Sequence, residues 1–326
     1  MFDTLSESVN QAISDFGTIK QAIIDKGVDV PSGTPTSQYG AKIGEIKSGS
    51  GDEEFIKMVE RSSTEITLPS GLTKIGDSVF YQYSNLTSVD IPESVTSIGS
   101  YAFFYCKNLA LTSLPSGITS IGSYAFQECI SLALTSLPSG ITNIGSNAFS
   151  SCSKLALTSL PENLTNIESN TFDNCSKLAL TSLPSGVTSI GSSAFGGCSK
   201  LALTYLPSGI TEIKYNVFRS CTNLALTSLP SNLKTIANFA FSSCTNLALT
   251  SIPSGVTSIG SSAFSYCTGL TEITFEGTPT SLASNAFYNC TNLTTIRVPW
   301  AEGEVANSPW GASSATIVYN YTPETT

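Results

Sequence analysis

The chain has 326 residues, a charged fraction of 12% and a net charge of −9. The charged fraction is about half of the usual share for soluble domains, and serine and threonine take the place of charged side chains. No basic stripe is present that could follow a phosphate backbone, which argues against nucleic-acid binding. The apolar runs are too short for a transmembrane helix, which argues against a membrane protein.

Residues 1–47 precede the repetitive part of the chain and are predicted to form an N-terminal α-helical segment. Apolar residues spaced alternately four and three positions apart run from Leu5 to Ile23 and form an a/d seam. A helix with such a seam needs a partner. That partner is either a further copy of the chain, with a trimer as the favoured homo-oligomer, or a second short helix within residues 39–46.

A pattern with a period of 23 residues occupies most of the remaining chain. Phenylalanine recurs at this spacing, and a cysteine follows three residues after nine of the ten phenylalanines. A period of this length predicts a solenoid in which each coil is one short supersecondary unit. The predicted fold class is therefore a repeat solenoid with one short parallel strand per coil, in addition to the N-terminal helical segment. The phenylalanines are Phe80, Phe103, Phe126, Phe149, Phe172, Phe195, Phe218, Phe241, Phe264 and Phe287.

The coil that follows Cys106 shows the expected organisation of one unit. Leu109–Leu114 is typical of a short strand, and Pro115–Gly117 is typical of a turn. Ile118 and Ile121 are expected to point inward from a second extended or 3₁₀ piece. The cysteines are odd in number and share one core position, so we expect buried, reduced thiols and no metal site.

The string from Leu86 to Cys106, L-T-S-V-D-I-P-E-S-V-T-S-I-G-S-Y-A-F-F-Y-C, resembles the BspA-like class of leucine-rich repeats. The resemblance covers roughly residues 60–300. It implies a curved leucine-rich-repeat array that acts in binding or adhesion and not in catalysis. The chain contains no histidine, so the usual serine and cysteine triads are excluded. We therefore expect no enzymatic activity and no cofactor.

Seven middle coils depart from this pattern in the segment after the cysteine. The sixth residue after the cysteine is threonine where the family has an apolar residue, and the fifth is leucine. Because side chains alternate along a strand, this shift exchanges the inner and outer faces. Either a bulge returns the leucines to the core, or they form an exposed ligand surface. We favour the bulge, because an open leucine stripe invites aggregation.

The serine and threonine side chains of these coils have two interpretations. They are either solubilising filler or a face that binds a sugar or a protein. Tyr205 interrupts the serine column and is a candidate for a local contact. The candidate ligand face consists of Leu111, Ser113, Leu134, Ser136, Leu157, Ser159, Leu180, Ser182, Leu203, Tyr205, Leu226, Ser228, Leu249 and Ser251.

The two ends of the chain resemble another class of protein. Residues 19–46 resemble a segment of tail and fibre proteins of phages of Gram-positive bacteria, and residues 298–321 are similar to C-terminal pieces of such proteins. Independently of this resemblance, Trp300 and Trp310 are expected to cover the open end of the last coil. The expected organisation is a helical anchoring or oligomerisation segment at 1–47, a flexible linker at 48–53, a solenoid of about ten coils at 54–299 and a C-terminal cap at 300–326.

These resemblances favour a tail-associated phage or prophage virion protein. Its solenoid would contact a glycan or protein of the bacterial host surface, and its N-terminal helix would bind other virion proteins. The start of the chain is acidic where a signal peptide needs a basic and then apolar stretch. We therefore expect a virion location, extracellular after lysis, without a signal peptide. The alternative is a bacterial cell-surface leucine-rich-repeat adhesin or antigen.

Overall fold

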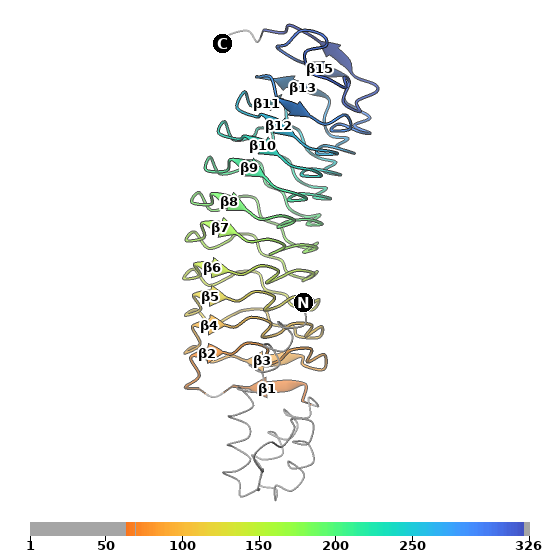
Figure 1. Ribbon diagram of the computed structural model, residues 1–326. Coiled ribbons are helices and arrows are strands. Elements are labelled where there is room, and N and C mark those ends of the chain that lie inside the picture. Colours follow the sequence, from red (N-terminus) through yellow and green to blue (C-terminus); the bar gives the residue numbers. More distant parts are fainter. Residues whose placement is uncertain (1–62, 69, 323–326) are drawn as a thin grey trace, which may run out of the picture.

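The computed structural model describes residues 63–68 and 70–322, which wind into a parallel β-solenoid (Figure 1). Successive coils stack along one axis in the order of the sequence. The strands are β1 (Glu65–Thr67), β2 (Lys74–Ile75), β3 (Ser88–Asp90), β4 (Ser97–Ile98), β5 (Ser120–Ile121), β6 (Asn143–Ile144), β7 (Asn166–Ile167), β8 (Ser189–Ile190), β9 (Glu212–Ile213), β10 (Thr235–Ile236), β11 (Ser251–Ile252), β12 (Ser258–Ile259), β13 (Glu272–Phe275), β14 (Ser281–Leu282), β15 (Thr295–Arg297) and β16 (Thr316–Val318).

The strands pair in parallel with partners one coil away. Ser97 of β4 pairs with Ser120 of β5, and Ser120 pairs with Asn143 of β6. Because this offset equals the repeat period, equivalent residues lie above one another along the solenoid. One row of strands contains β2-β4-β5-β6, β7-β8 and β9-β10-β12-β14, and a second row appears at the two ends as β1-β3 and β11-β13-β15-β16.

The predicted fold class is wrong in two respects. First, the described residues form a parallel β-solenoid that contains no α-helix, and the helical segment predicted for residues 1–47 lies outside them, as does the linker at 48–53. Second, the strand of the coil after Cys106 is Ser120–Ile121 and not Leu109–Leu114. The predicted strand segment has an irregular backbone in the middle coils, whereas coils at both ends carry two strands each.

The core consists of stacked columns of identical side chains. Consecutive phenylalanine rings lie nearly parallel, with centroids 5.1 Å apart for Phe80 and Phe103 and 5.8 Å apart for Phe195 and Phe218. The nine cysteines are buried free thiols, which confirms the prediction for them. Each coil alone has too little apolar surface for a core, so stacking supplies the burial that stabilises the fold.

Two buried tryptophans lie in the core at the C-terminal end of the solenoid. Trp300 and Trp310 are buried, and their rings meet edge to face with centroids 6.0 Å apart. The carbonyl oxygen of Trp310 accepts a hydrogen bond from the backbone N–H of Phe287. Strand β16 pairs with β15, which continues the second row of strands to its end.

Candidate binding surface

The middle coils differ from the first coils in the hydrogen bonds of the segment that follows the cysteine position. The backbone N–H of Ala110 donates to the carbonyl of Thr87, the equivalent residue of the preceding coil. In the next coil, the equivalent of Ala110 is Ala133. Its N–H donates to the carbonyl of Leu111 and not to that of Ala110, so the bond is shifted by one residue. The same shifted bond recurs up to Ala248 and Leu226. This shift is the bulge that the sequence favours.

The bulge turns the fifth residue after each cysteine inward. Leu134, Leu157, Leu180, Leu203, Leu226 and Leu249 are buried, and Leu111 is partly buried and packs against the core. The leucines of the candidate ligand face therefore form no exposed surface, and this part of the prediction is wrong. Burying a leucine side chain stabilises a protein by about 1.5–3 kcal/mol. This gain explains why the regular hydrogen bonds between neighbouring coils are lost in this segment.

The same bulge leaves two successive side chains of each middle coil facing solvent. We call these residues, together with Tyr205, the Thr/Ser surface. Its serines are exposed or partly exposed, its threonines are exposed, and Tyr205 is 53% exposed. The members are Thr112, Ser113, Thr135, Ser136, Thr158, Ser159, Thr181, Ser182, Thr204, Tyr205, Thr227, Ser228, Thr250 and Ser251.

The hydroxyl groups of the Thr/Ser surface have no hydrogen-bond partner within the part of the chain that the structure describes. A second threonine column, beside the other row of strands, behaves differently. The hydroxyl of Thr119 donates to the carbonyl of Thr96 at 3.2 Å, and the hydroxyl of Thr96 donates to the carbonyl of Thr73. One column therefore bonds to the solenoid itself, whereas the hydroxyl groups of the Thr/Ser surface face solvent.

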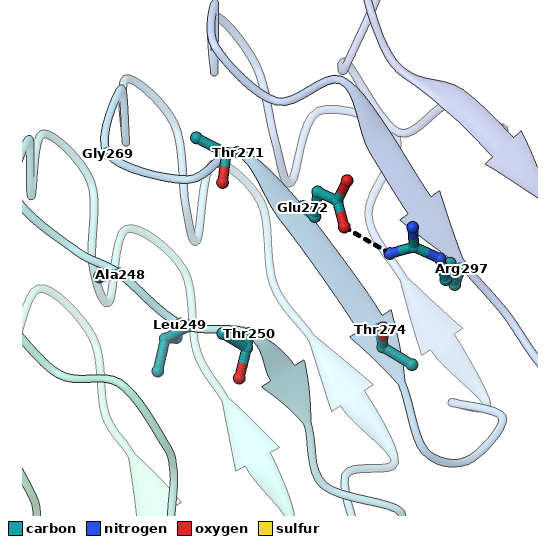
Figure 2. A pocket seen from close by; sticks show the side chains of 8 residues that line it. All are labelled: Ala248, Leu249, Thr250, Gly269, Thr271, Glu272, Thr274 and Arg297. Carbon is teal, nitrogen blue, oxygen red and sulfur yellow. Dashed lines mark hydrogen bonds and ion pairs between the residues drawn. The ribbon is translucent and has the colours of Figure 1, made fainter. Parts of the chain in front are cut away.

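A pocket of about 300 Å³ lies at the C-terminal end of the Thr/Ser surface (Figure 2). It forms where the bulged segment with Leu249 and Thr250 meets the regular strand β13. Arg297 on β15 donates a hydrogen bond to a carboxylate oxygen of Glu272 on β13 at 2.7 Å, and both side chains are partly exposed. This hydrogen bond raises the pKa of Arg297. The threonines Thr271 and Thr274 add hydroxyl groups to a lining that also has apolar side chains and carries no net charge.

Sequence reasoning missed most of this pocket. Of the residues in the predicted ligand face, Leu249 lines it, whereas Thr271, Glu272, Thr274 and Arg297 were not considered. The available signal was the end of the L-A-L-T pattern after Cys267, where the regular family pattern returns. A change of pattern between neighbouring coils leaves a step in the surface, and the pocket occupies that step.

The described residues offer no support for metal or thiol chemistry. They contain no group of three or more histidine, cysteine, aspartate or glutamate side chains that could hold a metal ion. Burial raises the pKa of the Cys152 thiol well above its ordinary value, and it raises that of Cys290 to about 12. These thiols are therefore protonated at neutral pH and are poor nucleophiles. The described part of the chain contains no helix that is long and apolar enough to span a membrane.

The short parallel strands, the 23-residue coils and the repeated leucines define a leucine-rich-repeat solenoid. The sequence matches the family described as BspA type leucine rich repeat region over residues 55–179 and 177–294. The match covers well over half of the chain, and the chain belongs to this family. No curated protein matches it significantly.

Several solved structures are similar to the chain. A leucine rich cell surface protein from Faecalibacterium prausnitzii is 27% identical, with coverage of 80% of this chain and 88% of that one and a TM-score of 0.48. A leucine-rich repeat protein from Bacteroides ovatus is 25% identical, with coverage of 79% and 84% and a TM-score of 0.37. The pneumococcal vaccine antigen PcpA is 18% identical, with coverage of 79% and 80% and a TM-score of 0.49. The expected resemblance to phage tail proteins is not among the similarities found.

Proposed function

We propose that the protein is a non-enzymatic binding protein of a bacterial cell surface, adhesin-like in its action, and that it holds a protein partner against the Thr/Ser surface. Membership of the BspA type family supports a binding role. The observation that carries the proposal is the column of outward-facing hydroxyl groups that the solenoid leaves without partners.

The size of the Thr/Ser surface favours a protein over a small ligand. Seven coils at a strand spacing of about 4.8 Å extend over about 30 Å. An interface of standard size buries about 800 Å² on each partner and spans a comparable length. Small molecules instead need a concave site that encloses most of their surface. An extended row of hydroxyl groups suits the backbone and side-chain polar groups of a second protein.

Tyr205 is the expected anchor of this interface. Its equivalents in the other middle coils are serines, and it stands 53% exposed near the middle of the row. Tyrosine is enriched among the few residues that dominate binding energy, because its large ring loses little conformational freedom on binding. The ring contributes apolar contact area, and the surrounding hydroxyl groups supply hydrogen bonds.

The test is the binding of the fluorescently labelled protein to a panel of intact bacterial and epithelial cells. Thr181→Glu, in the centre of the Thr/Ser surface, is expected to weaken binding at least tenfold, because a carboxylate disturbs the hydroxyl pattern. The matched control is Thr188→Glu, an exposed threonine of the other column. Binding should disappear when the cells are first treated with protease and should survive periodate oxidation of their glycans. Equal effects of the two glutamates, or loss of binding after periodate alone, would contradict the proposal.

A further inference from the structure

A second hollow lies on a different side of the solenoid, over the loops that join the buried phenylalanines to the cysteines in the C-terminal coils. It has a volume of about 570 Å³, within the range of about 300–1,000 Å³ that is usual for small-ligand sites. Its lining includes Arg219, Phe239, Tyr266 and Tyr288. We call it the aromatic groove.

The groove arises from the residue that follows the core phenylalanine in four successive coils. This position holds Arg219, Ser242, Ser265 and Tyr288 in turn, so two small side chains lie between two large ones. The two serines are buried and form the floor. The hydroxyl of Ser265 donates to the carbonyl oxygen of Ser262 at 3.0 Å and lies 2.9 Å from the hydroxyl of Ser242. Because a carbonyl oxygen can only accept, the proton of Ser265 goes to Ser262 and the hydroxyl of Ser242 donates to Ser265. The oxygen of Ser242 therefore keeps a lone pair that can accept a hydrogen bond from a ligand.

The walls of the groove are aromatic and open to solvent. Tyr266 is 45% exposed and Tyr288 is 53% exposed, and their ring centroids lie 5.7 Å apart at 78°. Phe239, from an earlier coil, is only half-buried. Large apolar side chains that gather around a hollow mark a binding site more often than scattered ones do. The first coils contrast with this arrangement, because there the rings of Tyr101 and Tyr124 stack directly on each other.

Polar groups of fixed orientation lie beside these rings. The side-chain oxygen of Asn285 accepts hydrogen bonds from the hydroxyl of Ser261 at 3.0 Å and from the backbone N–H of Ser262. Its NH₂ group donates to the hydroxyl of Ser262 and keeps a second N–H for a ligand. Arg219 alone is charged among the described residues that line the groove.

We propose that the aromatic groove binds a sugar residue that carries a carboxylate, such as a uronic acid. One face of a pyranose ring presents C–H groups, whose partial positive charge suits the negative face of an aromatic ring. The ring hydroxyls match Ser242 and Asn285, and the carboxylate matches the guanidinium of Arg219. This site is independent of the Thr/Ser surface, because its residues come from a different segment of each coil.

The test is a titration of the full chain with methyl β-glucuronide and with methyl β-glucoside, followed by saturation-transfer NMR. These two probes differ in the carboxylate alone. The glucuronide is expected to bind at least tenfold more tightly. Tyr288→Ala should weaken glucuronide binding at least tenfold, and Tyr288→Trp should retain it because the larger ring still stacks. Arg219→Gln should abolish the difference between the two sugars.

The control is Tyr205→Ser, which removes an equally exposed tyrosine from the Thr/Ser surface and should leave sugar binding unchanged. Far-UV circular dichroism of each variant checks that the solenoid remains folded. Failure of the wild-type protein to bind the glucuronide at about 20 mM, a concentration that would half-saturate a site about twentyfold weaker than a 1 mM complex, would overturn the proposal. Binding that persists in folded Tyr288→Ala, or equal binding of both sugars, would overturn it as well.

Discussion

The thiol of Cys175 donates a hydrogen bond to the carbonyl oxygen of Phe149 in the preceding coil, at a distance of 3.0 Å. The same bond joins Cys106 to Phe80 at one end of the array and Cys290 to Phe264 at the other. Each cysteine therefore fills a small apolar space and also satisfies a buried carbonyl, which would be costly to leave without a partner. This double role explains why cysteine recurs at this position of the repeat.

The first prediction concerns thiol reactivity. Because the cysteines are buried, a thiol reagent should label few of them in the native protein and all nine after denaturation. The measurement is a titration with a chromogenic disulfide reagent at neutral pH, before and after addition of guanidinium chloride. Rapid labelling of most thiols in the native protein would show that the cysteine column is not part of the core.

The second prediction concerns alkaline pH. Burial raises the pKa of the thiols from Cys129 to Cys290, so the native protein retains protons that the unfolded chain releases above about pH 8.5. Stability is fully present below that pH and falls as the pH rises, by up to about 1.4 kcal/mol per pH unit for each thiol. Urea unfolding at pH 7, 8.5 and 9.5 measures the effect. A midpoint that stays constant to pH 9.5 would contradict it.

The third prediction tests the bulge in the middle coils. Leu180 is buried, whereas Thr181 is exposed. Leu180→Ala should therefore cost about 2–5 kcal/mol of unfolding free energy, and Thr181→Ala should change it by less than about 0.5 kcal/mol. Chemical denaturation of both variants supplies the comparison. Similar costs at the two positions would favour a regular strand with exposed leucines.

The fourth prediction concerns the close approach of neighbouring coils. A Cβ atom on Gly145 would lie 2.5 Å from the backbone nitrogen of Ser123, and backbone cannot move aside as a flexible side chain can. A Cβ atom on Gly186 would meet nothing nearer than the carbonyl oxygen of Leu164 at 3.9 Å. Gly145→Ala should lower the melting temperature by a few degrees, since about 1 kcal/mol corresponds to about 2–4 °C in domains of about 150–250 residues and to less in a longer chain. Gly186→Ala should leave the melting temperature nearly unchanged. A larger loss for Gly186→Ala than for Gly145→Ala would contradict the close approach of neighbouring coils at Gly145.

The 23-residue period was enough to predict the solenoid and its core, because a phenylalanine or cysteine that recurs in register has to stack on its own copies. The strand position was predicted wrongly for a physical reason. Leu109–Leu114 has the composition of a strand, but Leu111 packs against the core, and the regular hydrogen-bond ladder between coils is lost in this segment. The ladder is instead formed by the short strand Ser120–Ile121.

The two hollows could not be predicted from a repeat pattern. The pocket beside Arg297 depends on a step between coils of different pattern. The aromatic groove depends on two small side chains that lie between two large ones in four successive coils. Such sites lie in the departures from the repeat, because a perfectly regular solenoid presents the same surface at every coil.

The central claim is that the Thr/Ser surface, with Tyr205 as its anchor, binds a protein partner on a cell surface. The most direct measurement compares cell binding by the wild-type chain and by Tyr205→Ser. This substitution installs the residue found at the equivalent position of the other middle coils, so the fold is expected to be unaffected. We predict a loss of at least tenfold in protease-sensitive cell binding, with Tyr288→Ala behaving as wild type in the same assay. Undiminished protease-sensitive binding by Tyr205→Ser would contradict the account.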